Sequence, residues 1–361
     1  MERLFRKVLW KDIIILIILV GITFMEYTTF KKIEPVKISY IIVSILTCVY
    51  AFFYTLYHCQ DIKQRKWLVL IYSISILFLY PRDMLDVFIY LLVAVIFLEN
   101  REKGLSAYFI ISTSFICFTM ICYFFELIPA RDMYRGDELR YGLGFVHPNT
   151  VFRYFFGSLM CLYILDKSKI YFNIYAISVA IPLYLLTDSR TGLICVAMFV
   201  VLANVGIVFK KHIEHIDFKY SYLLVTLFSI VFVIIFHDSN FFNELLSARP
   251  SFLYDILINS KWHLLTGHME YTYCDNRIFY LLVRDGAVAL FIVNAFYYVV
   301  FKKEQSVELK IIFIMAMIYG LTENFRDLGQ SVLPLLCLWS LYDNYLREKK
   351  QNLQLLINND K

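Results

Sequence analysis

Residues 221–236 read SYLLVTLFSIVFVIIF and contain no charged side chain. A strand of a membrane barrel would alternate apolar with polar residues, whereas this stretch is apolar on every face. Only helices and closed barrels satisfy the backbone hydrogen bonds inside a bilayer. The stretch therefore predicts a helix that crosses a membrane.

The composition extends this prediction to the whole chain. Of its 361 residues, 60% are apolar and 18% charged, with a mean hydropathy of +0.63. Soluble globular proteins are about half apolar and about one quarter charged. The chain is therefore a polytopic membrane protein, and a soluble enzyme, a nucleic-acid binder and a secreted disulfide scaffold are excluded. A basic start and an apolar run from Ile13 without a small-residue cleavage site predict a retained anchor.

We expect an all-α fold with about twelve transmembrane helices in one membrane domain, residues 1–361, because each crossing takes about 20 apolar residues. The expected spans are residues 13–30, 38–57, 67–80, 85–98, 107–128, 151–165, 170–186, 191–209, 221–236, 278–300, 309–321 and 330–346. The third and fourth are short and flank Pro81, so a re-entrant hairpin is the alternative for this pair.

The distribution of Lys and Arg predicts how the helices are oriented. With the N-terminus inside, the inner segments hold 21 of the 35 cations and the outer segments hold 14. Short cytoplasmic loops carry an excess of cations in membrane proteins. Both termini are therefore expected to be cytoplasmic.

The type of cation also differs between the two sides. Lys makes up 16 of the 21 inner cations, whereas Arg makes up 10 of the 14 outer ones. The planar fork of Arg matches phosphate and carboxylate groups bidentately. This favours an anion site on the outer face. Ion pairs with outer acids such as Asp137, Asp188 and Asp327 are the structural alternative.

Two outer loops are long, residues 129–150 and residues 237–277, whereas most other connections are short. Long ordered loops in compact proteins are usually functional, so both are expected to carry candidate site residues. The apolar spacing within residues 252–257 also predicts a short amphipathic helix on the outer surface.

Four polar clusters with arginines precede or begin helices that run inward from the outer face. They lie in residues 140–153, 187–192, 274–285 and 322–327. A helix N-terminus attracts anions, and an Arg in its first turn adds positive charge. Asn149 or Thr150, and Ser189, are the expected helix caps.

The motifs in these clusters resemble those of a known family. The stretch Gly144–Asn149 reads G-x-x-H-P-N, and Ser189–Gly192 reads S-R-T-G; Arg249, Gly267 and Asp275-Asn276 ahead of Gly286 follow. With them the chain resembles the bacterial O-antigen, capsular and exopolysaccharide repeat-unit polymerases (Wzy-type), in the O-antigen ligase-like superfamily. The resemblance covers residues 140–290 by motif and the whole chain by topology. Where this sequence has Asp275, the ligase branch usually has His.

The resemblance implies a polysaccharide polymerase in the bacterial plasma (inner) membrane. Its donor would be an oligosaccharide on polyprenyl diphosphate at the outer face, and its partners a flippase and chain-length regulators. An acceptor hydroxyl attacks the anomeric carbon and the lipid diphosphate leaves, which requires charge stabilisation and a general base. No D-x-D pair occurs in the sequence, so we expect no metal and no other cofactor. A single displacement predicts inversion.

The resemblance and the clusters assign roles to individual residues. The expected diphosphate ligands are Arg190, Arg249, Arg140 and Arg153, and the catalytic candidates are Asp275 as base and His147. Other expected substrate contacts are Asn149, Asn276, Ser189, Glu323, His263 and His268. Each has a structural alternative, namely an ion pair for the arginines, a helix cap for Asp275, a fixed turn for His147 and a buried polar network for Glu323.

Two other functions stay open. An O-antigen-type ligase would use the same motifs with a different acceptor. A transporter or flippase of lipid-linked oligosaccharide would also need an arginine-lined cavity. It should show repeat symmetry and cations reaching both faces. The only cations well inside the expected helices, Arg153 and Arg284, lie near their outer ends.

Overall fold

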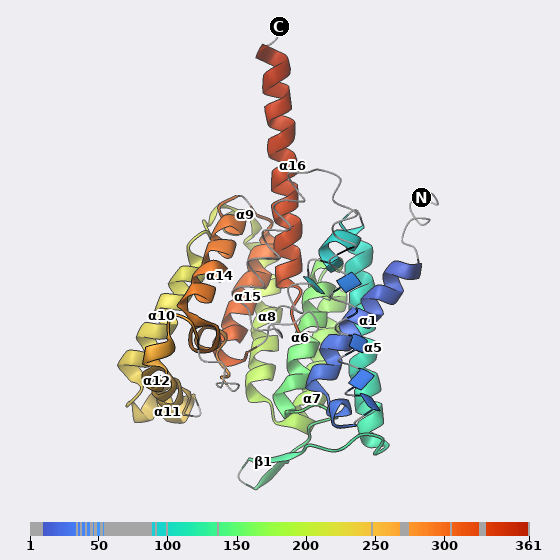
Figure 1. Ribbon diagram of the computed structural model, residues 1–361, viewed down its shortest axis with the longest axis vertical. Helices are drawn as coiled ribbons and strands as arrows, with labels where there is room; N and C mark the ends of the chain where they lie inside the picture. Colours follow the sequence, from blue (N-terminus) through green and yellow to red (C-terminus); the bar gives the residue numbers. More distant parts are fainter. Residues whose placement is uncertain are drawn as a thin grey trace. The chain divides into compact units, whose positions relative to one another are not determined.

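The computed structural model of the protein contains mainly helices (Figure 1). It describes residues 10–33, parts of 35–53, 89–98 except 91, 100–135, 137–246, 248–267, 274–303, 305–324 and 330–359. The expected span 67–80 lies outside the described residues, and the spans 38–57 and 85–98 lie inside them only in part.

The chain divides into two compact units. Unit 1 comprises Met1–Val208 and Phe325–Val332, and unit 2 comprises Phe209–Asn324 and Leu333–Lys361. In unit 1 the elements are α1 (Trp10–Tyr27), η2 (Thr29–Lys32), α5 (Arg101–Phe124), β1 (Met133–Arg135), β2 (Glu138–Arg140), α6 (Pro148–Leu165), α7 (Ile170–Thr187) and α8 (Arg190–Val208). In unit 2 they are α9 (Lys210–His215), α10 (Ser221–Phe236), α11 (Asn240–Leu245), α12 (Arg249–Asn259), η3 (Lys261–His263), α13 (Arg277–Tyr280), η4 (Leu281–Asp285), α14 (Gly286–Phe301), α15 (Val307–Thr322) and α16 (Leu333–Asn359).

Four helical segments among the described residues are long and apolar enough to cross a membrane. They are Arg101–Phe124, Ile170–Thr187, Arg190–Val208 and Arg277–Phe301. Shorter apolar helices cover Asp12–Met25 and Ser221–Phe236. These segments support a helical membrane protein, while the number of twelve spans and the position of the termini stay predictions.

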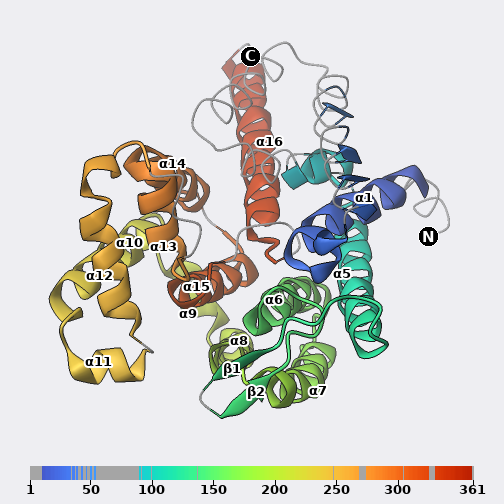
Figure 2. The ribbon, with the colours of Figure 1, turned by 60° about the horizontal axis from the view of Figure 1, so that its bottom comes forward.

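Helix α6 forms the centre of unit 1. It is buried along most of its length and contacts α5, α7 and α8 (Figure 2). Gly192 allows α8 to approach closely, because a Cβ there would lie 2.4 Å from Cγ of Phe152 on α6. The Tyr154 hydroxyl of α6 donates a hydrogen bond of 2.7 Å to the carbonyl of Thr23 on α1. Close approach at a small residue and hydrogen bonds between helices are the usual means of packing helices in membranes.

Helix α5 ends earlier than the apolar sequence predicts. The expected span was 107–128, but α5 covers Arg101–Phe124. Glu126 adopts the left-handed conformation (φ 57°), and the N–H of Leu127 donates to the carbonyl of Cys122 at 2.8 Å. This hydrogen-bonded reversal stops the helix although apolar residues continue to Ile128.

The loop of residues 129–150 contains a β-hairpin that the sequence did not predict. Strands β1 and β2 pair antiparallel, with Met133 opposite Arg140. The hairpin extends past the helix ends of unit 1 (Figure 1), and the segment after it bonds to the end of α7 through the N–H of Tyr141 and the carbonyl of Leu186 (3.0 Å). The hairpin thus brings charged residues of β1 and β2 to the junction of α7 and α8.

Unit 2 replaces the expected straight span 278–300 by a broken helix. The four residues of α13 lead into the π-helical turn η4, and α14 begins at Gly286, whose φ is +89°. The preceding loop closes on this break, since the N–H of Ala287 donates to the carbonyl of Leu264 at 2.7 Å. Gly267 and Gly286 are required here because a Cβ on either would lie within 2.5 Å of backbone atoms of the other segment.

A buried lysine joins α15 to α9 in the same unit. The ammonium group of Lys310 donates to the carbonyls of Ile213, Glu214 and Ile216 at 2.9, 2.7 and 2.9 Å. These carbonyls lie at the C-terminal end of α9, where a helix leaves acceptors unsatisfied. Elsewhere in unit 2, the amphipathic helix expected within residues 252–257 is present as α12.

Candidate functional site

The G-x-x-H-P-N stretch forms a fixed turn into α6. The N-cap of α6 is His147, whose Nδ1 accepts a hydrogen bond from the N–H of Asn149 at 3.1 Å. The expectation that Asn149 or Thr150 caps this helix was therefore wrong. Pro148 explains the earlier start, because proline is favoured in the first helical position. The structural role foreseen for His147 is the one that its contacts show.

The glycine of this motif holds the loop against neighbouring helices. Gly144 has φ +84°, and its carbonyl accepts from the N–H of Thr29 at 2.9 Å. A Cβ at Gly144 would lie 2.8 Å from Cγ2 of Thr119 on α5. The loop is therefore built around a glycine that no other residue replaces without strain.

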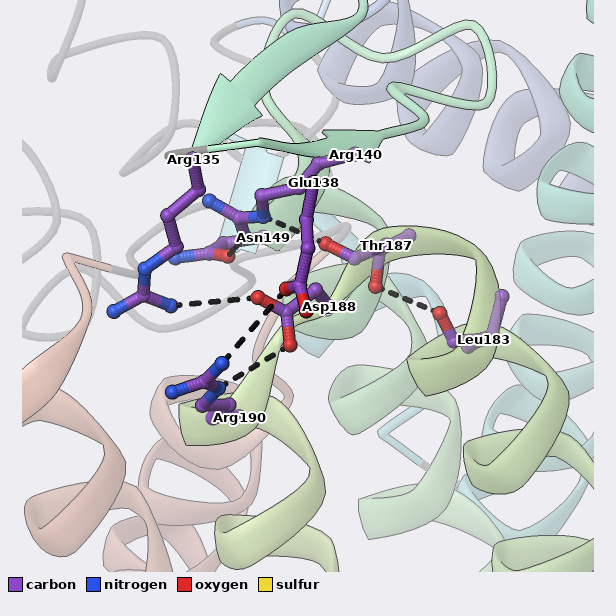
Figure 3. Close-up of polar contacts among 8 residues, drawn as sticks. All are labelled: Arg135, Glu138, Arg140, Asn149, Leu183, Thr187, Asp188 and Arg190. Atoms are coloured by element: carbon purple, nitrogen blue, oxygen red, sulfur yellow. Dashed lines mark hydrogen bonds and ion pairs between the residues drawn. The ribbon is translucent and has the colours of Figure 1, made fainter.

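Arg140 is buried and cross-links three segments. Its Nε donates to the carbonyl of Thr187 at 2.8 Å, and its Nη2 donates to Oδ1 of Asn149 at 2.7 Å (Figure 3). Arg140 and Asn149, which belong to one sequence cluster but were not paired with each other there, are thus in contact. Their contact joins β2 to the start of α6 and the end of α7, which is a structural role.

Arg190 remains accessible beside its acidic neighbours. Its Nε lies 3.3 Å from Oδ1 of Asp188, and its Nη2 lies 3.9 Å from Oε2 of Glu138. Arg135 approaches the other oxygen of Asp188 at 3.7 Å (Figure 3). The Arg190 side chain is 58% exposed, and exposed ion pairs contribute little stability. The guanidinium can therefore turn from Asp188 to an anionic ligand at small cost.

The remaining unit 1 candidates lie apart from these contacts or do not act as expected. Arg153 donates to Oγ1 of Thr150 at 2.8 Å, and its guanidinium lies 5.7 Å from the ring centroid of Tyr27. Ser189 was expected to cap α8, but its buried Oγ has no hydrogen-bond partner among the described residues. Asp188, which ends α7 in the left-handed conformation (φ 44°), directs its side chain to the arginines. We call Arg135, Glu138, Arg140, Asn149, Asp188 and Arg190 the Arg140 cluster.

A second polar cluster lies in unit 2 around Arg249. Arg249 begins α12 between Ala248, which has a left-handed φ of 59°, and Pro250. Its Nη2 lies 3.6 Å from Oδ2 of Asp275 and 3.7 Å from Oε1 of Glu323. The Asp275 side chain is 65% exposed, whereas that of Glu323 is only 3% exposed. One guanidinium thus faces one accessible and one buried carboxylate.

Asn276 is the residue that fixes this cluster to the helices of unit 2. Its Oδ1 accepts from the N–H groups of Ile278 and Phe279 at 2.9 and 3.1 Å, which caps α13. Its Nδ2 donates to the carbonyl of Leu321 at 3.0 Å and to Oγ of Ser229 at 3.3 Å. Asn276 therefore has a structural role that its backbone and interhelical contacts define.

Asp275 does not have the capping role that was its structural alternative, because Asn276 provides the cap. Next to it, Nη1 of Arg277 approaches Oδ1 of Asn324 at 3.5 Å. We call Arg249, Asp275, Asn276, Arg277, Glu323 and Asn324 the Arg249 cluster. Asp275 is its exposed carboxylate, positioned at the start of a membrane-length helical segment.

Arg284 was expected inside a helix, but the helix break around it was not predicted from the sequence. Arg284 and Asp285 lie in η4 and are both buried, with 4.0 Å between Nε of Arg284 and Oδ1 of Asp285. The Arg284 guanidinium lies 4.8 Å from the ring centroid of Tyr280. The only sequence signal for the break was Gly286 itself, since an isolated glycine inside a helical pattern destabilises the helix. π-Helical turns of this kind occur frequently at functional sites.

The loop of residues 237–277 contains two candidate histidines, His263 and His268. His263 lies in the exposed turn η3 that follows α12, and its carbonyl accepts from the N–H of Gly267 at 2.6 Å. His268 lies outside the described residues. Arg190 and Arg249 belong to different units, so the expectation that both bind the diphosphate stays a prediction.

Comparisons with protein-family models, curated proteins and solved structures find no match to this chain. The functional conclusion therefore depends on the residues and contacts described above.

Proposed function

We propose that the protein is a membrane glycosyltransferase that joins polyprenyl-diphosphate-linked oligosaccharide repeat units at the outer face of the bacterial plasma membrane. The observation that supports this proposal is the Arg249 cluster. It combines an arginine with an exposed carboxylate, 3.6 Å apart, beside a helical segment of membrane length. The G-x-x-H-P-N and S-R-T-G motifs add the family resemblance.

The reaction needs positive charge for the leaving group. The bond between the anomeric carbon and the diphosphate oxygen breaks, and a bond to the acceptor hydroxyl oxygen forms. Arg249 stabilises the charge on the departing lipid diphosphate through its fork of N–H donors. Arg190 is the second proposed ligand, because its exposed ion pair leaves it available to an anion.

The acceptor hydroxyl needs a base, and Asp275 is the proposed one. Its carboxylate takes the hydroxyl proton as the new glycosidic bond forms. Asp275 is paired with Arg249. A diphosphate that takes over Arg249 frees the Asp275 carboxylate, whereas Glu323, which is buried, keeps the arginine in place. One displacement at the anomeric carbon inverts its configuration.

Deleting the gene tests the function directly. We expect lipid-linked single repeat units to accumulate and surface polymer to be lost. Polymer that is made but not transferred to its final acceptor identifies a ligase. Loss of all repeat units from the outer leaflet identifies a transporter or flippase.

Complementation with single variants then tests the site. Arg249→Lys and Arg190→Lys should each lose most polymer although charge is kept, because the bidentate fork is lost. Arg347→Lys on the exposed part of α16 is the matched control and should restore polymer fully. Full polymer length with both Arg249→Lys and Arg190→Lys contradicts the proposed diphosphate site.

A further inference from the structure

A cavity of about 710 Å³ lies at the end of α5 in unit 1, outside both arginine clusters. Its walls come from the last turn of α5, the segment that follows it, and residues next to β2 and at the end of α7. This volume falls within the range of small-molecule sites. The cavity therefore has room for a ligand.

Three aromatic side chains and one fixed carboxylate line it. The rings of Tyr123 and Phe124 stand nearly perpendicular, at 73° with centroids 5.4 Å apart, and Tyr141 contributes a third ring. The Tyr123 hydroxyl donates to Asp132, whose two oxygens lie 2.9 and 2.8 Å away. The N–H of Gly142 donates to the same carboxylate at 2.8 Å. Tyr123, Asp132 and the backbone at Gly142 are thus held in one arrangement.

Glu126 adds a second carboxylate in a strained position. It occupies the left-handed C-terminal position of α5, where glycine or asparagine is usual. A side chain with a Cβ takes this conformation at a penalty, and such residues cluster at functional sites. The Glu126 side chain lines the cavity. Glycine would be more stable at this end of the helix, so stability does not explain why a glutamate occupies the position.

The lining selects a class of ligand. It contains two carboxylates and no lysine or arginine among the described residues, so it repels phosphate and other anions. A sugar ring presents apolar C–H faces that pack on aromatic rings and hydroxyls that donate to carboxylates. We infer that this cavity binds a saccharide that carries no negative charge.

The cavity borders the Arg140 cluster within unit 1. Tyr141 and Leu186 line it and bond to each other through their backbones at 3.0 Å. The adjacent residues in sequence, Arg140 and Thr187, are joined by the hydrogen bond of 2.8 Å from Nε of Arg140 to the carbonyl of Thr187. The inference rests on the proposed function only in naming the saccharide, which would belong to the lipid-linked glycan.

Binding is tested with the full chain in lipid nanodiscs on an array of printed neutral and amino-sugar oligosaccharides. The oligosaccharide retained most strongly is then titrated against variants. Tyr141→Ala and Phe124→Ala should each weaken binding about tenfold, the usual size of a lost aromatic contact. Tyr134→Ala and Phe125→Ala are the matched controls, since both residues are exposed aromatics (75% and 72%) that do not line the cavity.

Variants of Glu126 distinguish an effect on ligand binding from an effect on stability. Glu126→Gly relieves the left-handed strain and should raise the unfolding temperature while it weakens binding, and Glu126→Gln should weaken binding without that gain. Failure to retain any oligosaccharide overturns the inference, and so does equal binding by cavity and control variants. Saccharide binding at this cavity combined with normal polymer after gene deletion would refute the polymerase proposal alone. Normal polymer from every cavity variant, without cavity-dependent binding, would refute the cavity proposal alone.

Discussion

Asp275 and Asn276 are neighbours with different surroundings. The Asp275 carboxylate is exposed and pairs with Arg249, whereas Asn276 caps α13 and bonds to two other helices. We expect Asp275→Asn to keep wild-type stability and lose polymer, because only the basic oxygen is removed. Asn276→Ala should lower the free energy of unfolding by about 1–3 kcal/mol. Thermal unfolding and polymer length measured on both variants check this pair, and wild-type polymer from Asp275→Asn contradicts the proposed base.

Asp166, in the turn between α6 and α7, makes the stability of unit 1 depend on pH. Burial raises the pKa of this carboxyl, but hydrogen bonds from the N–H of Phe172 and from Ser168 outweigh it, so the pKa is lowered from 3.8. A lowered pKa stabilises the fold above the ordinary value and loses this effect as pH falls through the folded-state value. Asp166→Asn should therefore be less stable by about 1 kcal/mol at about pH 7, with the difference shrinking towards about pH 3. A difference in unfolding temperature that does not change between these pH values contradicts this assignment.

At the scale of elements, Lys310 holds α9 to α15. Lys310→Met should leave three carbonyls of α9 without their donor and lower the free energy of unfolding by about 1–3 kcal/mol. Lys302→Met is the control, since Lys302 is exposed at the end of α14. Amide hydrogen exchange should speed up in α9 for the first variant and stay unchanged for the second.

The break between η4 and α14 depends on two glycines. Gly286→Ala should destabilise unit 2 strongly, because its Cβ would lie 2.5 Å from the carbonyl oxygen of Leu265 and its φ is +89°. Gly21→Ala should have a smaller effect, because its Cβ meets only the end of the Phe115 ring at 3.2 Å. Unfolding temperatures of the two variants give the comparison, and equal losses would argue against the close approach of the two segments.

The elements that could be predicted are those set by local apolar composition. The helix at 221–236 is confirmed at both ends, and α12 forms where its apolar spacing indicated. The end of α5 and the break before α14 could not be placed, because they depend on left-handed backbone at Glu126 and on two glycines that meet across a loop. Apolar periodicity carries no information about such backbone reversals.

The residues of the candidate site could be predicted only in part. The motifs named Arg140, Asn149, Arg249 and Asp275 as candidates without pairing them, and the structure places Arg140 against Asn149 and Arg249 against Asp275. The capping residues were assigned wrongly at α6, because proline at the first helical position moves the cap to His147. Choosing between cap residues requires the backbone conformation, which side-chain preferences alone do not give.

On the scale of the whole molecule, stability in a bilayer has a different origin from that in water. Lipid is as apolar as the side chains of a membrane-spanning helix, so burying such side chains against other helices yields little hydrophobic free energy. Close packing and hydrogen bonds between helices must therefore supply most of the free energy that holds the helices together. Tyr154→Phe, which removes the bond to Thr23, should therefore destabilise unit 1 by about 1 kcal/mol in nanodiscs. Tyr134→Phe on the exposed hairpin should not, and equal unfolding temperatures would contradict this view.

The central position of α6 also has a consequence for synthesis. Its contacts come from α5, which is made before it, and from α7 and α8, which are made after it. If α6 crosses the membrane, as the expected span 151–165 predicts, lipid can cover its apolar face while the later helices are still missing. Insertion of the helix into the bilayer then precedes its packing against α7 and α8. A chain truncated after residue 169 would lack α7 and α8, so we expect it to be packed loosely and to be degraded by quality-control proteases.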